Sequence, residues 1–254
     1  VGQDKPLISP RAPESLAEVG VPPLAGAGNL WNWMPQIRYE ERVHLGSDFG
    51  LTPQIAFIQT NEHYANVPAR YADSLEKSRP SIEGRLAFSY KPDDLRAFEV
   101  APGFHASTTH VAGQSVPSRV GSIDWLIRPH PKAEFSGAFF QGRNFASLGG
   151  LPQGFTLLYP SRAIPVHGYG GWVQFSSPLT SRLTLHLFAG EQQNRTRDLL
   201  VGNVERNVNY AGNLMYRLGP NIIVSLEALQ MRTRLLSSGI QIQNHYDLAV
   251  AYLF

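Results

Sequence analysis

Large apolar residues alternate with small or polar ones in the stretch Tyr246-Asp247-Leu248-Ala249-Val250-Ala251-Tyr252-Leu253-Phe254. Side chains on a β-strand point alternately to its two faces, so this stretch predicts a strand with one wholly apolar face. The apolar face carries Tyr246, Leu248, Val250, Tyr252 and Phe254, while Asp247 and two alanines occupy the other. A strand of this kind lies between an apolar environment on one face and, on the other, water or a space that admits only small side chains.

The same alternation recurs along the chain, in segments separated by turn residues such as Pro, Asp, Asn and Gly. On this basis we predict eleven strands, at residues 35–44, 52–60, 81–91, 95–107, 119–129, 132–144, 165–177, 182–193, 204–218, 221–236 and 240–254. Pro102 lies inside one of them and suggests a bulge or local bend. The fold class is therefore predicted as all-β and antiparallel.

The composition limits the kind of membrane protein that this chain could form. Charged residues make up 17% of 254 residues, fewer than in most soluble domains, and the mean hydropathy is only −0.19. The apolar run from Leu248 to Phe254 is much shorter than the roughly 20 residues that a membrane-spanning helix needs. A helical membrane protein is excluded, whereas a transmembrane barrel dilutes its apolar residues with residues that face its lumen.

Connection lengths alternate along the chain. Short turns are predicted near residues 91–94, 129–131, 177–180 and 218–221, and longer polar links at 60–80, 110–118, 144–164 and 192–203. In an up-and-down meander every second connection emerges on the same side, so the short turns gather at one end of the sheet. Outer-membrane barrels have short periplasmic turns and long extracellular loops, which is the pattern expected here for residues 35–254.

The terminal strand and the aromatic residues near strand ends fit the same fold. A strand that ends on an aromatic residue resembles the assembly signal of bacterial outer-membrane barrels, here Tyr246, Leu248, Val250, Tyr252 and Phe254. Tyr90, Phe175 and Tyr216 would lie in an aromatic girdle, although aromatic residues also favour strands in general. A soluble all-β binding domain with the same alternation is the alternative.

Residues 1–34 do not fit the strand pattern. They are rich in Pro and Gly and are predicted to form an extracellular loop or the remnant of an earlier strand, with Val1–Asp4 as the tail of that strand. Bacterial single-chain barrels usually have an even number of strands, whereas eleven were counted. We therefore expect this chain, with about 11–12 strands, to be part of a larger barrel. A further strand that the alternation does not reveal is the alternative explanation of the odd number.

Short motifs in this region carry a resemblance to a known family. They are Gly2-Gln3-Asp4, Ser9-Pro10, Pro13-Glu14-Ser15-Leu16, Gly28-Asn29-Leu30-Trp31 and Pro35-Gln36-Ile37-Arg38. These residues, and more loosely the strand pattern that follows, resemble porin-like outer-membrane proteins of the DcaP-like kind. The resemblance implies a trimeric porin of about 16 strands, with several strands before Val1, and it leans towards small anionic solutes such as carboxylates.

Catalytic and metal-binding patterns are not found in the sequence. The histidines are scattered singly, cysteine is absent, and the Gly-rich stretch at 148–154 lacks the Lys-Ser or Lys-Thr of a phosphate loop. We predict no enzymatic activity, no cofactor and no metal, although a Ser and a His at a barrel rim, as in an outer-membrane lipase, remain an alternative. The net charge of +2 predicts no nucleic-acid partner.

Charged residues on the inward faces of the strands are the candidate site. So many ions would be costly in a packed core, whereas a water-filled lumen keeps them hydrated. Acidic and basic groups across a pore would orient small polar or charged solutes. Mutual salt bridges in a closed lumen are the alternative. The predicted pore-lining residues are Arg38, Glu40, Arg42, Glu83, Arg85, Glu99, Asp124, Arg128, Glu134, Arg217 and Glu227.

The sequence therefore predicts a bacterial outer-membrane porin for passive diffusion of small polar or charged solutes, and the resemblance implies anionic ones. The expected partners are the outer-membrane lipid bilayer, the assembly machinery of that membrane and two further copies in a homotrimer. The alternative function is a structural or adhesive barrel with a closed lumen, whose long loops bind external partners.

Overall fold

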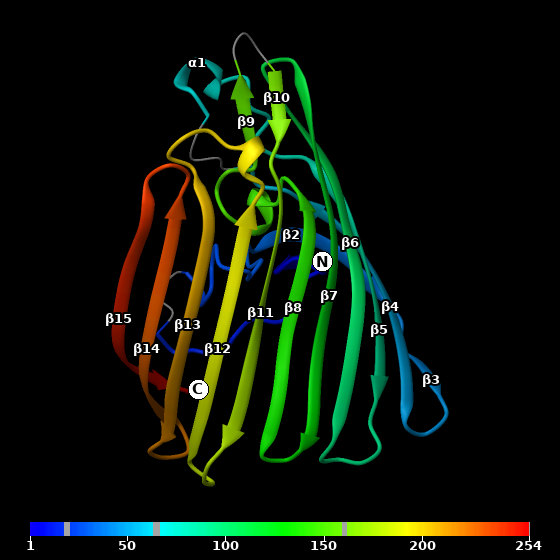
Figure 1. The fold of residues 1–254 in the computed structure, drawn as a ribbon. Coiled ribbons are helices and arrows are strands. Elements are labelled where there is room, and N and C mark those ends of the chain that lie inside the picture. The colour runs from blue at the N-terminus through cyan, green and yellow to red at the C-terminus, as the bar shows by residue number, and fades with distance from the viewer. Residues whose placement is uncertain (18–20, 63–66, 159–161, 254) are drawn as a thin grey trace.

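Antiparallel strands dominate the computed structural model, which describes residues 1–17, 21–62, 67–158 and 162–253. In this part of the chain they form one 13-stranded sheet and one two-stranded hairpin (Figure 1). The large sheet contains β1 (Gly2–Asp4), β2 (Met34–Glu40), β3 (Val43–Leu45), β4 (Phe49–Gln59), β5 (Pro80–Tyr90), β6 (Ala97–Val111), β7 (Gln114–His130), β8 (Ala133–Arg143), β11 (His167–Pro178), β12 (Leu183–Asn194), β13 (Val204–Arg217), β14 (Ile222–Leu235) and β15 (Gly239–Tyr252). The hairpin contains β9 (Phe155–Leu158) and β10 (Arg162–Pro165).

Helical structure is confined to the connections. The helices are α1 (Ala69–Ala72), η1 (Ala146–Leu148) and η2 (Thr196–Asp198). Among the residues that the structure describes, no helix has the length and apolar character needed to cross a membrane.

The predicted up-and-down order is confirmed. Neighbours in the sheet follow the order β1-β2-β4-β5-β6-β7-β8-β11-β12-β13-β14-β15, with β3 paired to β4. The predicted strand at 35–44 divides into β2 and β3, although both keep one register against β4. Pro53 lies between the two paired segments and accepts a hydrogen bond from the Glu41 N–H. Because proline has no N–H to return, the ladder is interrupted there.

Pro102 behaves similarly in β6. Arg85 pairs with Gly103 and Phe88 with Val100, so the β5–β6 ladder has a gap beside Pro102 but no shift in register. The bulge suggested by the sequence is therefore absent at this position. A missing N–H interrupts the ladder without inserting an extra residue.

The link predicted at 110–118 is wrong, because β6 and β7 continue into a tight hairpin. Val111 pairs with Gln114, and Ala112 and Gly113 form the turn with φ angles of 50° and 73°. Two positive φ angles are typical of the turn whose twist suits a hairpin. Val111 and Val116 are buried beside Phe155 of β9, so packing against a neighbouring loop extends these two strands.

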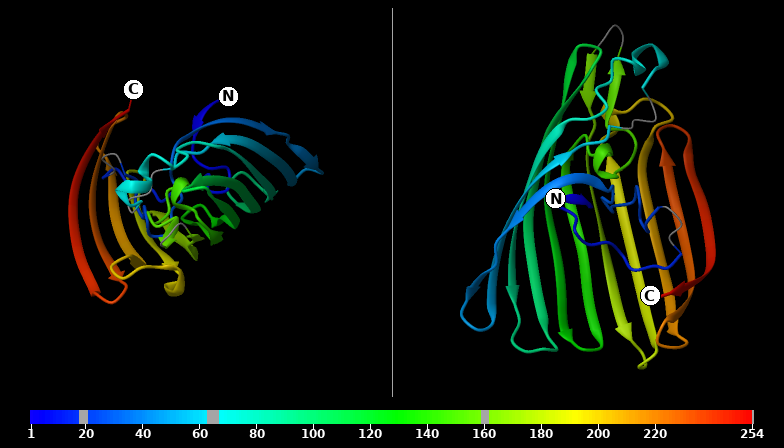
Figure 2. Two further views of the ribbon diagram at one scale, coloured as in Figure 1. Left: turned by 90° about the horizontal axis from the view of Figure 1, so that it is seen from above. Right: turned by 180° about the vertical axis from the view of Figure 1, so that it is seen from behind.

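The sheet is curved, and its two edges are not paired with each other in the described residues. The pairing order begins at β1 and ends at β15, and Figure 2 shows these edges on opposite sides of a hollow. On β15 the predicted assembly-signal residues Tyr246, Leu248, Val250 and Tyr252 are all exposed. Phe254 lies outside the described residues.

The convex face of the sheet exposes many apolar side chains. Large exposed side chains alternate with buried ones on successive strands, and they include Ile37, Phe57, Phe104, Phe139, Tyr169, Val173, Leu187, Tyr210, Leu214 and Leu226. Near the short-turn end Phe49 stacks on Tyr90 at a centroid distance of 4.6 Å. The rings of Phe135 and Phe175 form a tilted pair, with their centroids 5.1 Å apart. Aromatic residues therefore pair at strand ends, as a girdle would require.

Residues 5–17 and 21–33 lie on the concave face of the sheet, and we call them the inner segment. Figure 2 shows this segment, in dark blue, inside the curve. Leu7, Ile8 and Leu30 are buried with Val120 and Phe140 of the sheet. Leu24 packs against Trp172 and Phe188. The extracellular loop expected from the sequence is thus a segment folded against the sheet, while Gly2–Asp4 pair with β2 as an edge strand.

Candidate functional site

The inner segment crosses the concave face and is held there by side chains from successive strands. Its first half donates hydrogen bonds to Glu83 of β5, Glu99 of β6, Gln174 of β11 and Glu227 of β14. These residues are far apart in the sequence, and the sheet brings them into one row below the segment. The candidate site is therefore the concave face together with residues 5–15.

Arg85, Glu99 and Asp124 form the centre of this site, and Arg11 of the inner segment joins them. The Arg85 guanidinium contacts both oxygens of Asp124, each at 2.7 Å, and Glu99 Oε1 at 2.7 Å. Arg11 Nη2 donates to the same Glu99 oxygen at 2.6 Å. Asp124 is 1% exposed, so its charge depends on these two cations. The cluster holds two cations and two anions.

Glu83 anchors the start of the inner segment. Its Oε2 accepts hydrogen bonds from the backbone N–H groups of Leu7 and Ile8 at 2.5 and 3.3 Å. Its other oxygen lies 2.8 Å from His105 Nδ1. Because both residues are fully buried, the carboxylate satisfies backbone donors that would otherwise lose water without compensation.

A second set of contacts holds residues 14 and 15 against the far strands. The Ser15 hydroxyl donates to Glu227 Oε2 at 2.5 Å, and Asn213 donates to the same oxygen at 3.0 Å. Asn213 also donates to the Glu14 carbonyl at 2.8 Å. The Glu14 N–H donates to Gln174 at 2.6 Å. The segment is thus tied at both ends of the curved sheet.

The remaining predicted residues lie nearer the edges and ends of the concave face. Arg38 donates to Gln36 at 2.9 Å and lies 3.4 Å from Asp4. Glu40 pairs with Arg42 at 3.6 Å, and Arg128 pairs with Glu134. Arg217 donates to the carbonyl of Pro220 at 3.2 Å. These residues are not part of the central cluster, although they face the same side of the sheet.

A polar cleft of about 400 Å³ opens beside the cluster towards the short-turn end. Its charged lining residues are Glu40, Arg42, Asp48, Arg85, Lys91 and Glu99. Positive and negative groups are equal in number there. The cleft can therefore hold water and small polar solutes, with little net bias in charge.

Residues of the inner segment are what the sequence interpretation missed. Arg11, Glu14 and Ser15 were assigned to an external loop, yet they bind the concave face. Leu7 and Ile8 were a usable signal, since adjacent apolar residues in a Pro-rich stretch need burial. No cluster of residues suited to a metal ion occurs in the described parts of the chain.

Comparisons with known proteins agree with this architecture. No protein-family model and no curated protein matches the sequence. The structure is similar to the outer membrane channel DcaP of Acinetobacter baumannii, with a TM-score of 0.77 and 13% identity over 100% of this chain and 70% of that one. It is also similar to an anion-selective porin from Comamonas acidovorans, with a TM-score of 0.58 and 10% identity over 86% and 59%.

At these identities the similarity establishes the fold. The resemblance predicted from the short motifs is confirmed at that level, and so is the all-β, antiparallel fold class. The chain folds as a large part of an up-and-down β-barrel of the kind found in outer-membrane channels.

Proposed function

We propose that this chain forms most of the wall of a bacterial outer-membrane channel for passive diffusion of small polar solutes. The observation that carries the proposal is the division between the two faces of one sheet. Its convex face exposes apolar side chains, and its concave face holds Arg85, Glu99, Asp124 and Glu227. A sheet with one apolar and one charged face fits a position between lipid and water.

The orientation follows from the ends of the strands. Short turns join β7 to β8, β11 to β12 and β13 to β14 at one end, which we place in the periplasm. The described parts of the links at 60–79, 144–166 and 195–203 lie at the other end, which we place outside the cell. A closed wall also needs further strands between β1 and β15, because backbone groups at an open edge cannot be left unpaired in lipid.

The inner segment narrows the lumen in this proposal. Its contacts with β5 through β14 place backbone and side chains across the hollow, so solutes would pass through the space beside it. The pore-lining residues that matter most are then those next to the polar cleft, including Arg42, Arg85 and Glu99. Arg42 is the most exposed of these, at 76% of its side chain.

Small anions are the finer proposal for the solute. The balanced charges of the cleft supply little bias, so this preference rests on the resemblance of the sequence motifs and on the anion-selective neighbour. A salt gradient across a planar bilayer tests it through the reversal potential. Arg42→Gln should shift that potential towards cation preference, whereas Arg182→Gln on a short turn outside the cleft should not.

Single-channel recording tests the channel itself. Protein folded in detergent and inserted into a planar bilayer should give discrete conductance steps with a nearly linear current–voltage relation. A homogeneous, heat-modifiable barrel preparation that inserts but never conducts would contradict the proposal.

A closed barrel that binds external partners through its long links is the second candidate. The apolar clusters formed by Leu7, Ile8, Leu24 and Leu30 on the concave face favour it, because they fill part of the hollow. The bilayer recording separates the two candidates. In either case we propose a homotrimer, inserted by the outer-membrane assembly machinery through the outward face of β15.

A further inference from the structure

Three arginines and one histidine form a row across the convex face at the long-link end of the sheet. Arg119 of β7 lies directly opposite Arg143 of β8, and Arg143 lies opposite His167 of β11. Arg195 follows β12, and its N–H donates to the His167 carbonyl at 2.7 Å. Arg119 lies on the opposite face of β7 from the concave-facing Asp124, and His167 lies on the opposite face of β11 from the concave-facing Gln174. Arg143 pairs with both residues, so these three side chains belong to the outer surface, and Arg195 lines the same cleft.

This row is unfavourable for the fold by itself. Like charges directly opposite each other on neighbouring strands destabilise a sheet. Arg119 donates to the backbone carbonyls of Ser107 and Ser118, and His167 lies 2.8 Å from Asp198. Within the described ranges, none of the three guanidinium groups forms an ion pair with a carboxylate. An external anion would remove the repulsion.

The row lines a cleft of about 610 Å³, where arginine N–H groups can donate hydrogen bonds to the oxygen atoms of a ligand. The polar side chains of Gln141, Tyr169, Gln193 and Thr196 also line it. Arginine is well suited to phosphate because its planar guanidinium can donate two parallel hydrogen bonds. Three arginines around one cleft therefore favour a phosphate group over a singly charged ligand.

An apolar depression of about 370 Å³ lies directly below this cleft on the same strands. Tyr169 lines both spaces, and Trp125, Phe139 and Val173 line the lower one. The rings of Phe139 and Tyr169 are 6.4 Å apart at their centroids. The surface thus passes from cationic to apolar along the strand direction, which fits a ligand with a charged head and an apolar tail.

We propose that Arg119, Arg143, His167 and Arg195 bind the phosphorylated headgroup of a membrane glycolipid, whose acyl chain lies along Phe139, Tyr169 and Val173. The proposal rests on the membrane position of the proposed function, and it concerns the outer wall rather than the lumen. The long-link end would then lie at the outer leaflet, with the row at headgroup depth.

Binding of diphosphoryl lipid A to the detergent-folded protein tests the proposal. Native mass spectrometry would compare this lipid with its dephosphorylated form and with inorganic phosphate. Arg143→Gln with Arg195→Gln should weaken binding by about ten-fold to a hundred-fold, because hydrogen bonds between charged groups are lost. Arg119 is left unchanged in this variant, because its side chain donates hydrogen bonds to two backbone carbonyls of the β6–β7 hairpin.

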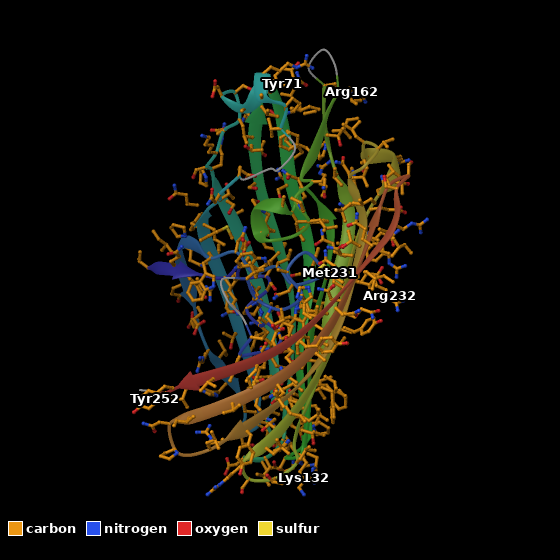
Figure 3. All side chains as sticks on the ribbon, turned by 90° about the vertical axis from the view of Figure 1, so that its left-hand side faces the viewer. Tyr71, Lys132, Arg162, Met231, Arg232 and Tyr252 are labelled. Carbon is orange, nitrogen blue, oxygen red and sulfur yellow. The ribbon has the colours of Figure 1, made fainter. Side chains whose placement is uncertain are left out.

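Lys132→Gln with Arg182→Gln is the matched control. It removes the same charge from short turns, and Figure 3 shows Lys132 at the opposite end of the sheet from Arg162. The control should bind lipid as the wild type does, and both double variants should keep the heat-modifiable mobility of a folded barrel. Arg143→Lys with Arg195→Lys should retain part of the affinity.

Three results would overturn the proposal. Equal binding of the dephosphorylated lipid would show that phosphate is not recognised, and equally tight binding of inorganic phosphate would show that no lipid is needed. If the Arg143 and Arg195 variant loses its oligomeric state but keeps the lipid, the row is a contact between copies. Channel recording tests the proposed channel function separately from the proposed lipid site, because the row lies outside the lumen. If the folded protein binds the lipid but never conducts, the channel proposal is contradicted and the lipid-site proposal is not.

Discussion

At the residue scale, the buried charges of the concave face are the most consequential groups. Arg85 and Asp124 share two hydrogen bonds, and both side chains are almost fully buried. Taking one charge from such a pair leaves the other without compensation. Replacing both by uncharged residues removes that penalty.

Asp124→Asn should therefore lower the free energy of unfolding by about 3–5 kcal/mol. Arg85→Met together with Asp124→Leu should recover most of that loss. Urea titration in micelles, monitored by tryptophan fluorescence, measures the free energy of unfolding of the single and the double variant. Glu134→Gln is the control, since its partner Arg128 is 42% exposed and the pair should contribute less than about 1 kcal/mol. Equal effects of Asp124→Asn and Glu134→Gln would contradict the assignment of the cluster.

Asp93 provides a pH-dependent contact in the turn between β5 and β6. A hydrogen bond from the Arg96 side chain at 2.7 Å, helped by the backbone N–H groups of Arg96 and Leu95, lowers the pKa of the Asp93 carboxyl. A lowered folded-state pKa means that this contact stabilises the turn above the ordinary carboxyl pKa. The stabilisation is lost as the pH falls through the folded-state value.

Hydrogen–deuterium exchange of the turn, corrected for intrinsic rates, should accordingly show protection at Leu95 and Arg96 that disappears on acidification. Asp93→Ala should abolish that dependence. Asp94→Ala, which changes the neighbouring exposed acid, should leave it intact. A dependence that persists in Asp93→Ala would show that another group controls the turn.

At the element scale, the inner segment depends on a close backbone approach at Gly28. This residue has a φ of +101°, and a Cβ there would overlap the carbonyl oxygen of Gly171 and press on that of Glu191. Only glycine permits both the left-handed conformation and the approach. Any side chain at position 28 would therefore push the segment away from β11.

Gly28→Ala should displace the inner segment, speed proteolysis within residues 5–34 and increase the single-channel conductance. Gly46→Ala is a matched control, because Gly46 also has a positive φ, +86°, but open space around its would-be Cβ. Backbone strain alone, about 1–3 kcal/mol, is common to both variants. If the two variants behave alike, the contact with Gly171 is not what positions the segment.

Strand positions could be predicted closely, and the reason is local. Alternation along Ile222–Leu235 or Ala133–Arg143 is visible in the sequence because every second side chain faces apolar surroundings. The hairpin at Ala112-Gly113 could not be predicted, since Val111 and Val116 are strand residues through their contact with Phe155. Elements stabilised by distant partners carry no local signal of their extent.

At the scale of the whole molecule, the open edges β1 and β15 are the central feature. β15 pairs with β14 along its length, and its other edge is not paired with another strand among the described residues. In a closed channel the backbone groups on that side must be hydrogen-bonded, because lipid offers no alternative.

Amide exchange in the conducting, bilayer-inserted protein should therefore be as slow along β15 as along β12, which is paired on both sides. Peptides from the two strands can be compared in one hydrogen–deuterium exchange experiment. Fast exchange of every second amide of β15, with β12 protected, would show that the wall remains open there.

The sequence by itself determined most strands of the large sheet, their two faces and the short turns at one end of it, because each depends on neighbours within a few residues. It also identified Arg85, Glu99 and Asp124 as inward charges, but not as one cluster with Arg11. Only the tertiary structure decided that pairing, the place of the inner segment on the concave face and the row from Arg119 to Arg195. Each of these brings together residues that are distant along the chain, and the curvature and register of the sheet set their distances.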